Sequence, residues 1–176
     1  MDPTTPAIPP LPEDGDAFIA LEAIDSPVLK QGLVYWQGLR AGRKFPLRGD
    51  ITPRGLGGLL RNALLLRVID SGRDYEYRIV GDAHVLAHGV SVQGKLWSQV
   101  NDAQSAHRQM NKVTYDRVVQ SGEPVALHSW MERDSNRRQL IYREAVYLPL
   151  GADEETVDHI LGFSVYFPRA VRDVGG

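Results

Sequence analysis

The spacing of apolar residues changes along the chain and predicts helical segments first and strands later. After Ser26, apolar residues recur every three or four positions, which is typical of a helix with one buried face. That face carries Leu29, Leu33, Trp36 and Leu39. Ser26 is a good N-cap, Pro27 suits the first helical position and Gly42 can end the helix, so we predict an amphipathic helix over residues 27–41. Thr52-Pro53 is a similar start signal and predicts a second, short helix that ends near Arg61.

From residue 63 the pattern has the two-residue period of strands. Residues 63–70 and 74–80 flank a turn that contains glycine and predict an antiparallel hairpin. A short helix follows at 82–87, and the longest helix is predicted at 104–120, before Ser121-Gly122. Three strands are predicted to close the chain, at 124–133, 138–149 and 157–167, with polar turns at 134–136 and 151–156.

This order predicts an α+β domain, in which a five-stranded antiparallel sheet carries helices on one face and an N-terminal amphipathic helix precedes it. Five prolines among the first 12 residues, followed by acidic residues, predict a disordered or extended tail over residues 1–25. We assign residues 26–61 to an N-terminal helical extension, 62–168 to the core domain and 169–176 to a C-terminal tail.

Composition and charge exclude several classes of protein. The sequence has no cysteine, which rules out disulfide scaffolds and cysteine-based zinc sites. The net charge is only −2, which gives no electrostatic argument for nucleic acid as a partner. No apolar run approaches the ~20 residues that span a bilayer. We therefore expect a cytoplasmic protein with neither nucleic acid nor membrane as a partner.

Several short motifs, taken in order, resemble a PAS domain over roughly residues 28–168. The N-terminal part resembles the single-domain bacterial PAS group, whose members begin with a Tyr-Trp, Leu-Arg, Asp-Ile block; here it reads Tyr35-Trp36, Leu39-Arg40, Arg43 to Pro46 and Asp50-Ile51-Thr52-Pro53. Further resemblances lie at Tyr77 to Gly81, Gly122-Glu123-Pro124 and Tyr147 to Leu150. Two positions depart from the family: Gly81 replaces a frequent asparagine, and His84 stands where an aromatic residue is common.

The resemblance implies a ligand pocket between the sheet and the central helices. We predict that apolar side chains form its wall and that a histidine or arginine meets an anionic or carbonyl group. The candidates are Trp97, Met110, Trp130 and Phe163 for the wall, and Arg78, His84 and Arg143 for the polar contact. The competing interpretation is that the aromatic residues only fill the core and that the arginines face solvent.

The nature of a cofactor is left open, and neither haem nor flavin is expected. Some PAS domains hold haem through a histidine on the long helix, and the resemblance makes His107 the candidate here, but its polar neighbours indicate a solvated turn. His84 and His88 have a spacing that could suit a metal, but no third ligand is apparent, so no metal site is predicted.

The leading functional hypothesis is a non-catalytic PAS sensory module that binds a small metabolite or a protein partner and signals through protein–protein contact. One alternative is an adaptor without ligand; another is a small enzyme of the cone-shaped (NTF2-like) fold, which would need an Asp–His pair in its cavity. We expect a homodimer and an unidentified signalling protein as partners. The contact face is predicted to be the helix stripe of Leu29, Leu33, Trp36 and Leu39, which could also cover its own sheet.

Overall fold

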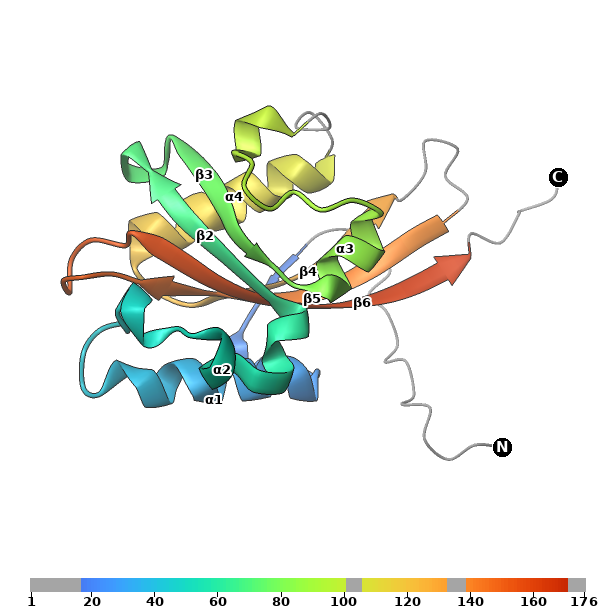
Figure 1. The fold of residues 1–176 in the computed structure, drawn as a ribbon. Helices are drawn as coiled ribbons and strands as arrows, with labels where there is room; N and C mark the ends of the chain where they lie inside the picture. Colours follow the sequence, from blue (N-terminus) through green and yellow to red (C-terminus); the bar gives the residue numbers. More distant parts are fainter. Residues whose placement is uncertain (1–16, 101–105, 133–138, 171–176) are drawn as a thin grey trace, which may run out of the picture.

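The computed structural model describes residues 17–100, 106–132 and 139–170. Four α-helices and six strands account for most of these residues (Figure 1). The helices are α1 (Pro27–Arg40), α2 (Pro53–Leu56), α3 (Asp82–His88) and α4 (Ala106–Ser121). The strands are β1 (Ala17–Ile19), β2 (Ala63–Ile69), β3 (Asp74–Val80), β4 (Val125–Glu132), β5 (Gln139–Leu150) and β6 (His159–Ala170). Four predicted segments lie wholly or partly outside the described residues: residues 1–16 of the tail predicted at 1–25, residues 171–176 of the tail predicted at 169–176, residues 104–105 of the long helix and the turn at 134–136.

All six strands form one antiparallel sheet in the order β1-β4-β5-β6-β2-β3. The α+β class and the antiparallel pairing were predicted correctly, but the count of five strands was wrong. The sixth strand, β1, is a three-residue segment that pairs with β4 through Phe18 and Leu127. It lies in the segment that was predicted as a tail. The prediction missed it because three residues after a proline-rich stretch are too few to show the two-residue alternation of a strand.

Helices cover both faces of the sheet (Figure 1). Helices α3 and α4 lie on one face, as predicted for the core, while α1 and α2 lie on the opposite face. Alternation along the strands assigns side chains to each side: Arg143 and Tyr147 of β5 face α4, and the neighbouring Glu144 faces α1. Each strand in the middle of the sheet is therefore buried on both sides.

Helix α1 is fixed to the sheet at both of its ends. At its start, the Ser26 side chain accepts a hydrogen bond from the Leu29 amide, and the buried Glu144 carboxylate accepts from the amides of Asp25 and Ser26. One turn before its end, Trp36 Nε1 donates to the carbonyl oxygen of Pro149 at 2.9 Å. The amphipathic helix was predicted within one residue of its observed bounds.

The apolar stripe of α1 covers the protein's own sheet. Leu29 and Trp36 are buried, and Leu33 and Leu39 are partly buried against the same core. Of the two uses that the sequence left open for this stripe, the structure shows the intramolecular one.

The second predicted helix is shorter than expected. Thr52 and Pro53 start it as predicted, with Thr52 Oγ1 accepting from the Gly55 amide, but α2 ends at Leu56. Gly57 has a φ of +52°, which favours glycine and interrupts the α-helical path. A 3-10 segment, Gly57–Asn62, then leads into β2.

Two glycines of α1 offer a matched test of how tightly the helix packs. A Cβ atom on Gly32 would lie 2.5 Å from a ring carbon of Phe163, whereas a Cβ on Gly38 would meet nothing within 4 Å. Gly38→Ala is expected to stabilise the protein by about 0.5–1 kcal/mol through helix propensity. Gly32→Ala is expected to destabilise it by about 1–3 kcal/mol, because the ring or the helix has to shift. Urea unfolding of both variants measures these changes, and a stabilised Gly32→Ala variant would contradict the packing described here.

No helix in the ranges that the structure describes is both long and apolar enough to cross a membrane.

Candidate functional site

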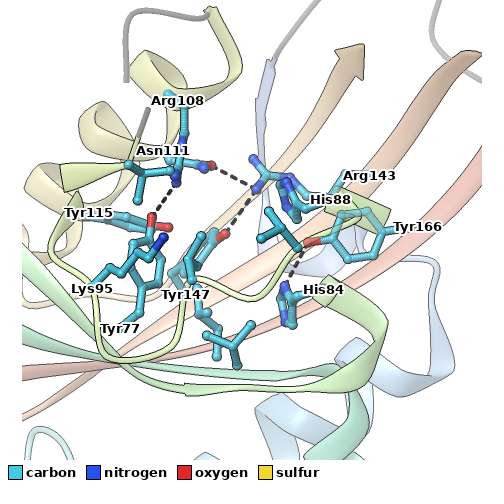
Figure 2. A pocket seen from close by; sticks show the side chains of 15 residues that line it. Tyr77, His84, His88, Lys95, Arg108, Asn111, Tyr115, Arg143, Tyr147 and Tyr166 are labelled. Carbon is cyan, nitrogen blue, oxygen red and sulfur yellow. Dashed lines mark hydrogen bonds between the residues drawn. The ribbon is translucent and has the colours of Figure 1, made fainter. Parts of the chain in front are cut away.

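A cavity of about 230 Å³ lies between the sheet and helices α3 and α4, and the segment between α3 and α4 forms part of its wall (Figure 2). Fifteen described side chains line it, contributed by four strands (β2, β3, β5 and β6), two helices (α3 and α4) and residues 90–100: Leu64, Tyr77, Val80, His84, His88, Val90, Val92, Lys95, Val100, Arg108, Asn111, Tyr115, Arg143, Tyr147 and Tyr166. About a third of them are aliphatic, and the remainder carry hydroxyl, amide, imidazole or cationic groups. This mixture of apolar wall and converging polar groups is characteristic of small-molecule sites.

Arg143 of β5 extends from the sheet towards α4. Its Nε donates to Ser129 Oγ at 2.8 Å, and its Nη1 donates to Asn111 Oδ1 at 2.8 Å and to the Tyr147 hydroxyl at 3.3 Å. The side chain is only 2% exposed. Arg143 therefore joins two strands and α4 at the wall of the cavity, and its planar guanidinium is held in one orientation.

A second buried arginine, Arg108, enters from α4. Its Nη1 donates to the Tyr77 hydroxyl at 2.8 Å, and the guanidinium also lies over the Tyr77 ring, 5.8 Å from the ring centre. Burial is the largest cause that raises the pKa of Tyr77. This phenol stays protonated at neutral pH, so it can act as a hydrogen-bond donor but not as a base.

His84 forms a second polar cluster at the α3 side of the cavity. Its Nε2 lies 3.0 Å from the backbone carbonyl of Asn62 and its Nδ1 lies 2.8 Å from the Tyr166 hydroxyl. Because a carbonyl can only accept, Nε2 carries the proton, and Nδ1 accepts from Tyr166. Burial lowers the pKa of His84 to about 4. The ring is therefore neutral at pH 7 and links α3 to β6.

Gly81, at the start of α3, is explained by close packing. A Cβ at this position would overlap the carbonyl oxygens of Leu60 and Arg61, so a larger residue could not bring α3 this close to the preceding segment. This contact places His84 beside Asn62. The departure from the frequent asparagine thus belongs to the geometry that seats His84 in the core.

His107 is buried, contrary to the solvated turn that its neighbours suggested. It is 8% exposed, its ring lies 5.3 Å from that of His88, and its Nε2 is 3.4 Å from the Asn111 side-chain nitrogen. Burial, with a smaller contribution from the charge of Arg143, lowers its pKa well below the ordinary value. The sequence interpretation failed because the buried face of α4 is itself polar: it includes His107, Arg108, Asn111 and Thr114.

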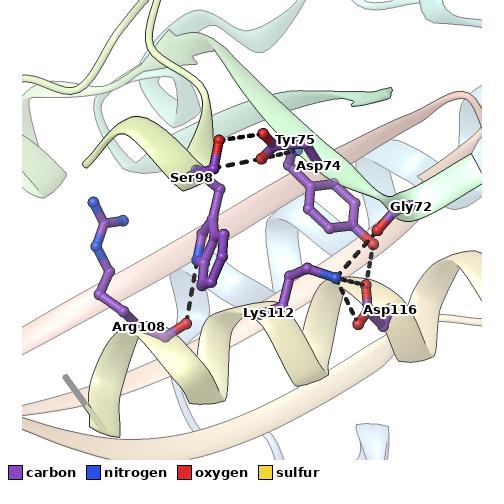
Figure 3. A network of polar contacts seen from close by, with 8 residues as sticks. Gly72, Asp74, Tyr75, Ser98, Arg108, Lys112 and Asp116 are labelled. Atoms are coloured by element: carbon purple, nitrogen blue, oxygen red, sulfur yellow. Dashed lines mark hydrogen bonds and ion pairs between the residues drawn. The ribbon is translucent and has the colours of Figure 1, made fainter. Parts of the chain in front are cut away.

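Two of the seven predicted ligand-binding residues, His84 and Arg143, line the cavity together. Arg78 lies at the surface, with its side chain 53% exposed and paired with Glu76 at 2.9 Å. Trp97 and Met110 pack partly buried at α4, where Trp97 Nε1 donates to the Arg108 carbonyl oxygen (Figure 3). None of these three residues contributes to the described lining.

The other two predicted wall residues, Trp130 and Phe163, lie on the opposite face of the sheet. Phe163 packs under Gly32 of α1, and Trp130 contacts Tyr142, which alternates with Arg143 along β5. The β6 residues on the cavity side are instead Gly162, Ser164 and Tyr166. The apolar residues of β6 that share a face with Phe163 pack in the core under α1.

Sequence reasoning missed the tyrosines and Arg108. Tyr147 stands four residues after Arg143 on a strand, so the two share a face, and this spacing was a usable signal. Tyr77 alternates with Glu76 and Arg78 along the predicted strand, and this alternation was a usable signal too. Arg108 gave no usable signal, because an arginine in a polar helical turn normally faces solvent.

The lining side chains offer hydrogen bonds and positive charge. Within the described ranges, no group of three histidine, cysteine or acidic side chains could hold a metal ion. The described lining also contains no carboxylate that could pair with His84 or His88 as a general acid–base dyad. Neutral imidazole, phenol hydroxyls and oriented guanidinium groups remain, and these can position a small polar molecule.

The sequence profile of one protein family, described as the PAS domain, matches residues 24–165. None of the curated proteins matches this chain in sequence. Among solved structures, an RNA-binding light-oxygen-voltage receptor is similar with a TM-score of 0.43 and 15% identity over 68% of this chain, which spans only 35% of that protein. A light-oxygen-voltage protein of Rhodobacter sphaeroides is similar with a TM-score of 0.42 and 12% identity over 70% of this chain and 71% of its own.

Proposed function

Since this chain belongs to the PAS domain family, a sensory or regulatory module in general, we propose that it is non-catalytic and binds a small molecule in the cavity between the sheet and helices α3 and α4. The cavity supports this proposal most directly. The cavity has a volume of about 230 Å³ and lies on one face of the sheet, where buried and oriented polar groups line it. On the opposite face of the same sheet, the side chains of α1 pack against the core. A filled core would not need to carry two buried guanidinium groups.

The same contacts suggest how occupancy becomes a signal. Arg143 and Asn111 join β5 to α4, and His84 joins α3 to β6 through Tyr166. A ligand that bonds to either cluster competes with these contacts or adds to them, and so changes the packing of α3 or α4. A changed helix surface can then be read by a partner protein.

A homodimer and a downstream signalling protein are further parts of the proposal. The stripe expected to form the contact is covered by the protein's own sheet. An intermolecular contact of α1 would therefore use its outer face, where Val34 is 66% exposed.

Native mass spectrometry and an absorption spectrum of freshly purified protein test the proposed function. We expect a retained small molecule that is lost on denaturation. Val92→Trp, which adds bulk to the cavity wall, should lower its occupancy, whereas Val34→Trp, which adds the same bulk to the outer surface of α1, should not. The polypeptide mass alone, in every preparation, would favour the adaptor without ligand. The spectrum reports any haem or flavin, and the same native masses report whether a dimer forms.

A further inference from the structure

Positive charge reaches the cavity from three separate elements. Arg143 extends from β5, Arg108 from α4 and Lys95 from the segment between α3 and α4 (Figure 2). The two guanidinium groups belong to residues that are 2% and 4% exposed. The described lining contains no aspartate or glutamate. Since charges interact more strongly where water is excluded, this wall favours an anionic ligand over a neutral or cationic one.

The arginines are oriented as well as charged. Arg143 is held by Ser129 and Asn111, and Arg108 by the Tyr77 hydroxyl. A guanidinium is a planar fork of N–H groups, which matches the two oxygens of a carboxylate. Because Nε and Nη1 of Arg143 already donate to Ser129, Asn111 and Tyr147, a carboxylate that binds both prongs of the fork would replace or share one of these bonds. Binding such a group loses little side-chain entropy, because the fork is already ordered.

The buried histidines do not add to the positive charge but respond to it. Burial is the largest cause that lowers the pKa of His84, and the charge of Arg143 lowers it further. For His107 the next causes after burial are the charges of Arg143, His88 and Arg108. Both rings are therefore neutral at pH 7, whereas the two arginines and Lys95 supply positive charge at this wall.

The rest of the lining limits the body of the ligand. Leu64, Val80, Val90, Val92 and Val100 supply aliphatic surface around the polar groups. The volume of about 230 Å³ is below the range of roughly 300–1,000 Å³ that drug-sized ligands occupy. The space thus fits a small molecule with one charged end and an apolar remainder.

We infer that the cavity binds a small organic acid as its carboxylate, with the carboxylate on the Arg143 guanidinium and the apolar remainder against the valines. Arg108 and Lys95 supply the surrounding positive potential. This inference rests on the proposed function and names the ligand class for it. A phosphate ester is the other small organic anion, but proteins commonly hold phosphate with backbone amides at helix starts and nests. The donors identified on this wall are side chains, which favours the planar carboxylate.

Three probes that share one ring separate these chemistries: phenylacetate, phenylacetamide and phenyl phosphate. Calorimetric titration of the full chain is expected to show that phenylacetate binds at least about tenfold more tightly than the amide, because hydrogen bonds to a charged group are stronger than those to a neutral one. Phenyl phosphate should bind more weakly than phenylacetate. Arg143→Gln should weaken phenylacetate about tenfold and leave the amide unchanged. Lys95→Gln, at an exposed residue, should weaken phenylacetate by a smaller factor even if the Arg143 variant fails to fold.

Each other outcome has a definite meaning. If the amide binds as tightly as the acid, the inference on charge is overturned while the cavity remains a binding site. Tighter binding of phenyl phosphate would overturn the carboxylate in favour of a phosphate. If no probe binds, the inference is wrong for acids of this size, and a molecule retained in native mass spectra would still support the proposed function. Phenylacetate binding that Val92→Trp leaves unchanged would place the ligand outside the cavity and contradict the proposed function itself.

Discussion

Trp36→Ala is expected to lower the free energy of unfolding by about 3–5 kcal/mol, one of the two largest effects that the structure predicts. Trp36 is 3% exposed and lies in the core between α1 and the sheet. Its Nε1 also donates to the Pro149 carbonyl oxygen at 2.9 Å. The alanine variant loses the buried ring, leaves a cavity and removes the donor to a buried carbonyl, so three costs add.

Two variants of the same helix calibrate this effect. Trp36→Phe keeps most of the buried ring and loses the hydrogen bond, and we expect a cost of about 1–2 kcal/mol. Val34→Ala, at a side chain that is 66% exposed, should change the free energy of unfolding by less than about 0.5 kcal/mol. Urea unfolding followed by circular dichroism measures all three. A cost below about 1 kcal/mol for Trp36→Ala would mean that α1 does not dock on the sheet as described.

Strands β5 and β6 contact α1 on one face of the sheet and line the cavity on the other face. Phe163 and Val146 pack under α1, and the residues that alternate with them on the other face include Tyr147 and Tyr166 of the cavity lining. Interiors are densely packed, so a shift of β5 or β6 on one face is transmitted to the other. In the proposed function, a ligand on Arg143 would therefore change the packing of α1 without contacting this helix. A partner protein could then detect the ligand through α1 as well as through α3 and α4.

The strands and helices could be predicted well because each has a clear local signal. The predicted hairpin strand at 74–80 coincides with β3, since the buried Tyr75 and Tyr77 alternate with Glu76 and Arg78 on a partly exposed face. The missing element, β1, exists only because the edge of β4 is available to pair with it. The residues of β1 alone do not show that this edge is available, because β4 is distant in the sequence.

The faces of the central strands could not be predicted in the same way. Alternation shows that Phe163 and Ser164 point to opposite sides, but it does not show which side holds a cavity when both are covered by helices. Wall residues were therefore chosen by size, which selected Trp130 and Phe163 from the wrong face. Small residues in a buried strand, such as Gly162 beside the Tyr147 ring, mark the cavity side better than large ones.

Helix α4 shows the same limit for polar residues. Met110 was expected to line the pocket, yet the buried face of the helix carries His107, Arg108 and Asn111, and Val113 is 52% exposed. When the buried face of a helix is polar, its sequence looks like that of a solvent-exposed helix. The two cases can be told apart only when the residues that bond to these polar side chains are known. Here the partners are Tyr77 and Arg143, which come from strands 31 and 32 residues away in sequence.

The second large effect that we expect is a loss of stability in acid: protonation of His84 should lower the free energy of unfolding. Burial lowers the pKa of this ring to about 4, whereas its unperturbed value is 6.5. Between these values the unfolded chain binds a proton that the folded protein does not, so the free energy of unfolding falls as the pH falls. The contribution is complete above about pH 6.5 and is lost progressively towards pH 4; the gap corresponds to roughly 3 kcal/mol.

The variant His84→Gln keeps a donor for the Asn62 carbonyl and an acceptor for Tyr166 but removes the titrating group. Its free energy of unfolding should fall by roughly 3 kcal/mol less than that of the wild type between pH 7 and pH 4. Some acid sensitivity should remain, because the pKa of the buried His107 is also lowered. Urea unfolding at several pH values measures the difference, and the ring resonances of His84 report its pKa directly. A His84 titration midpoint near 6.5 in the folded protein, or equal pH profiles for the two proteins, would show that the ring is solvated and that the link between α3 and β6 does not form.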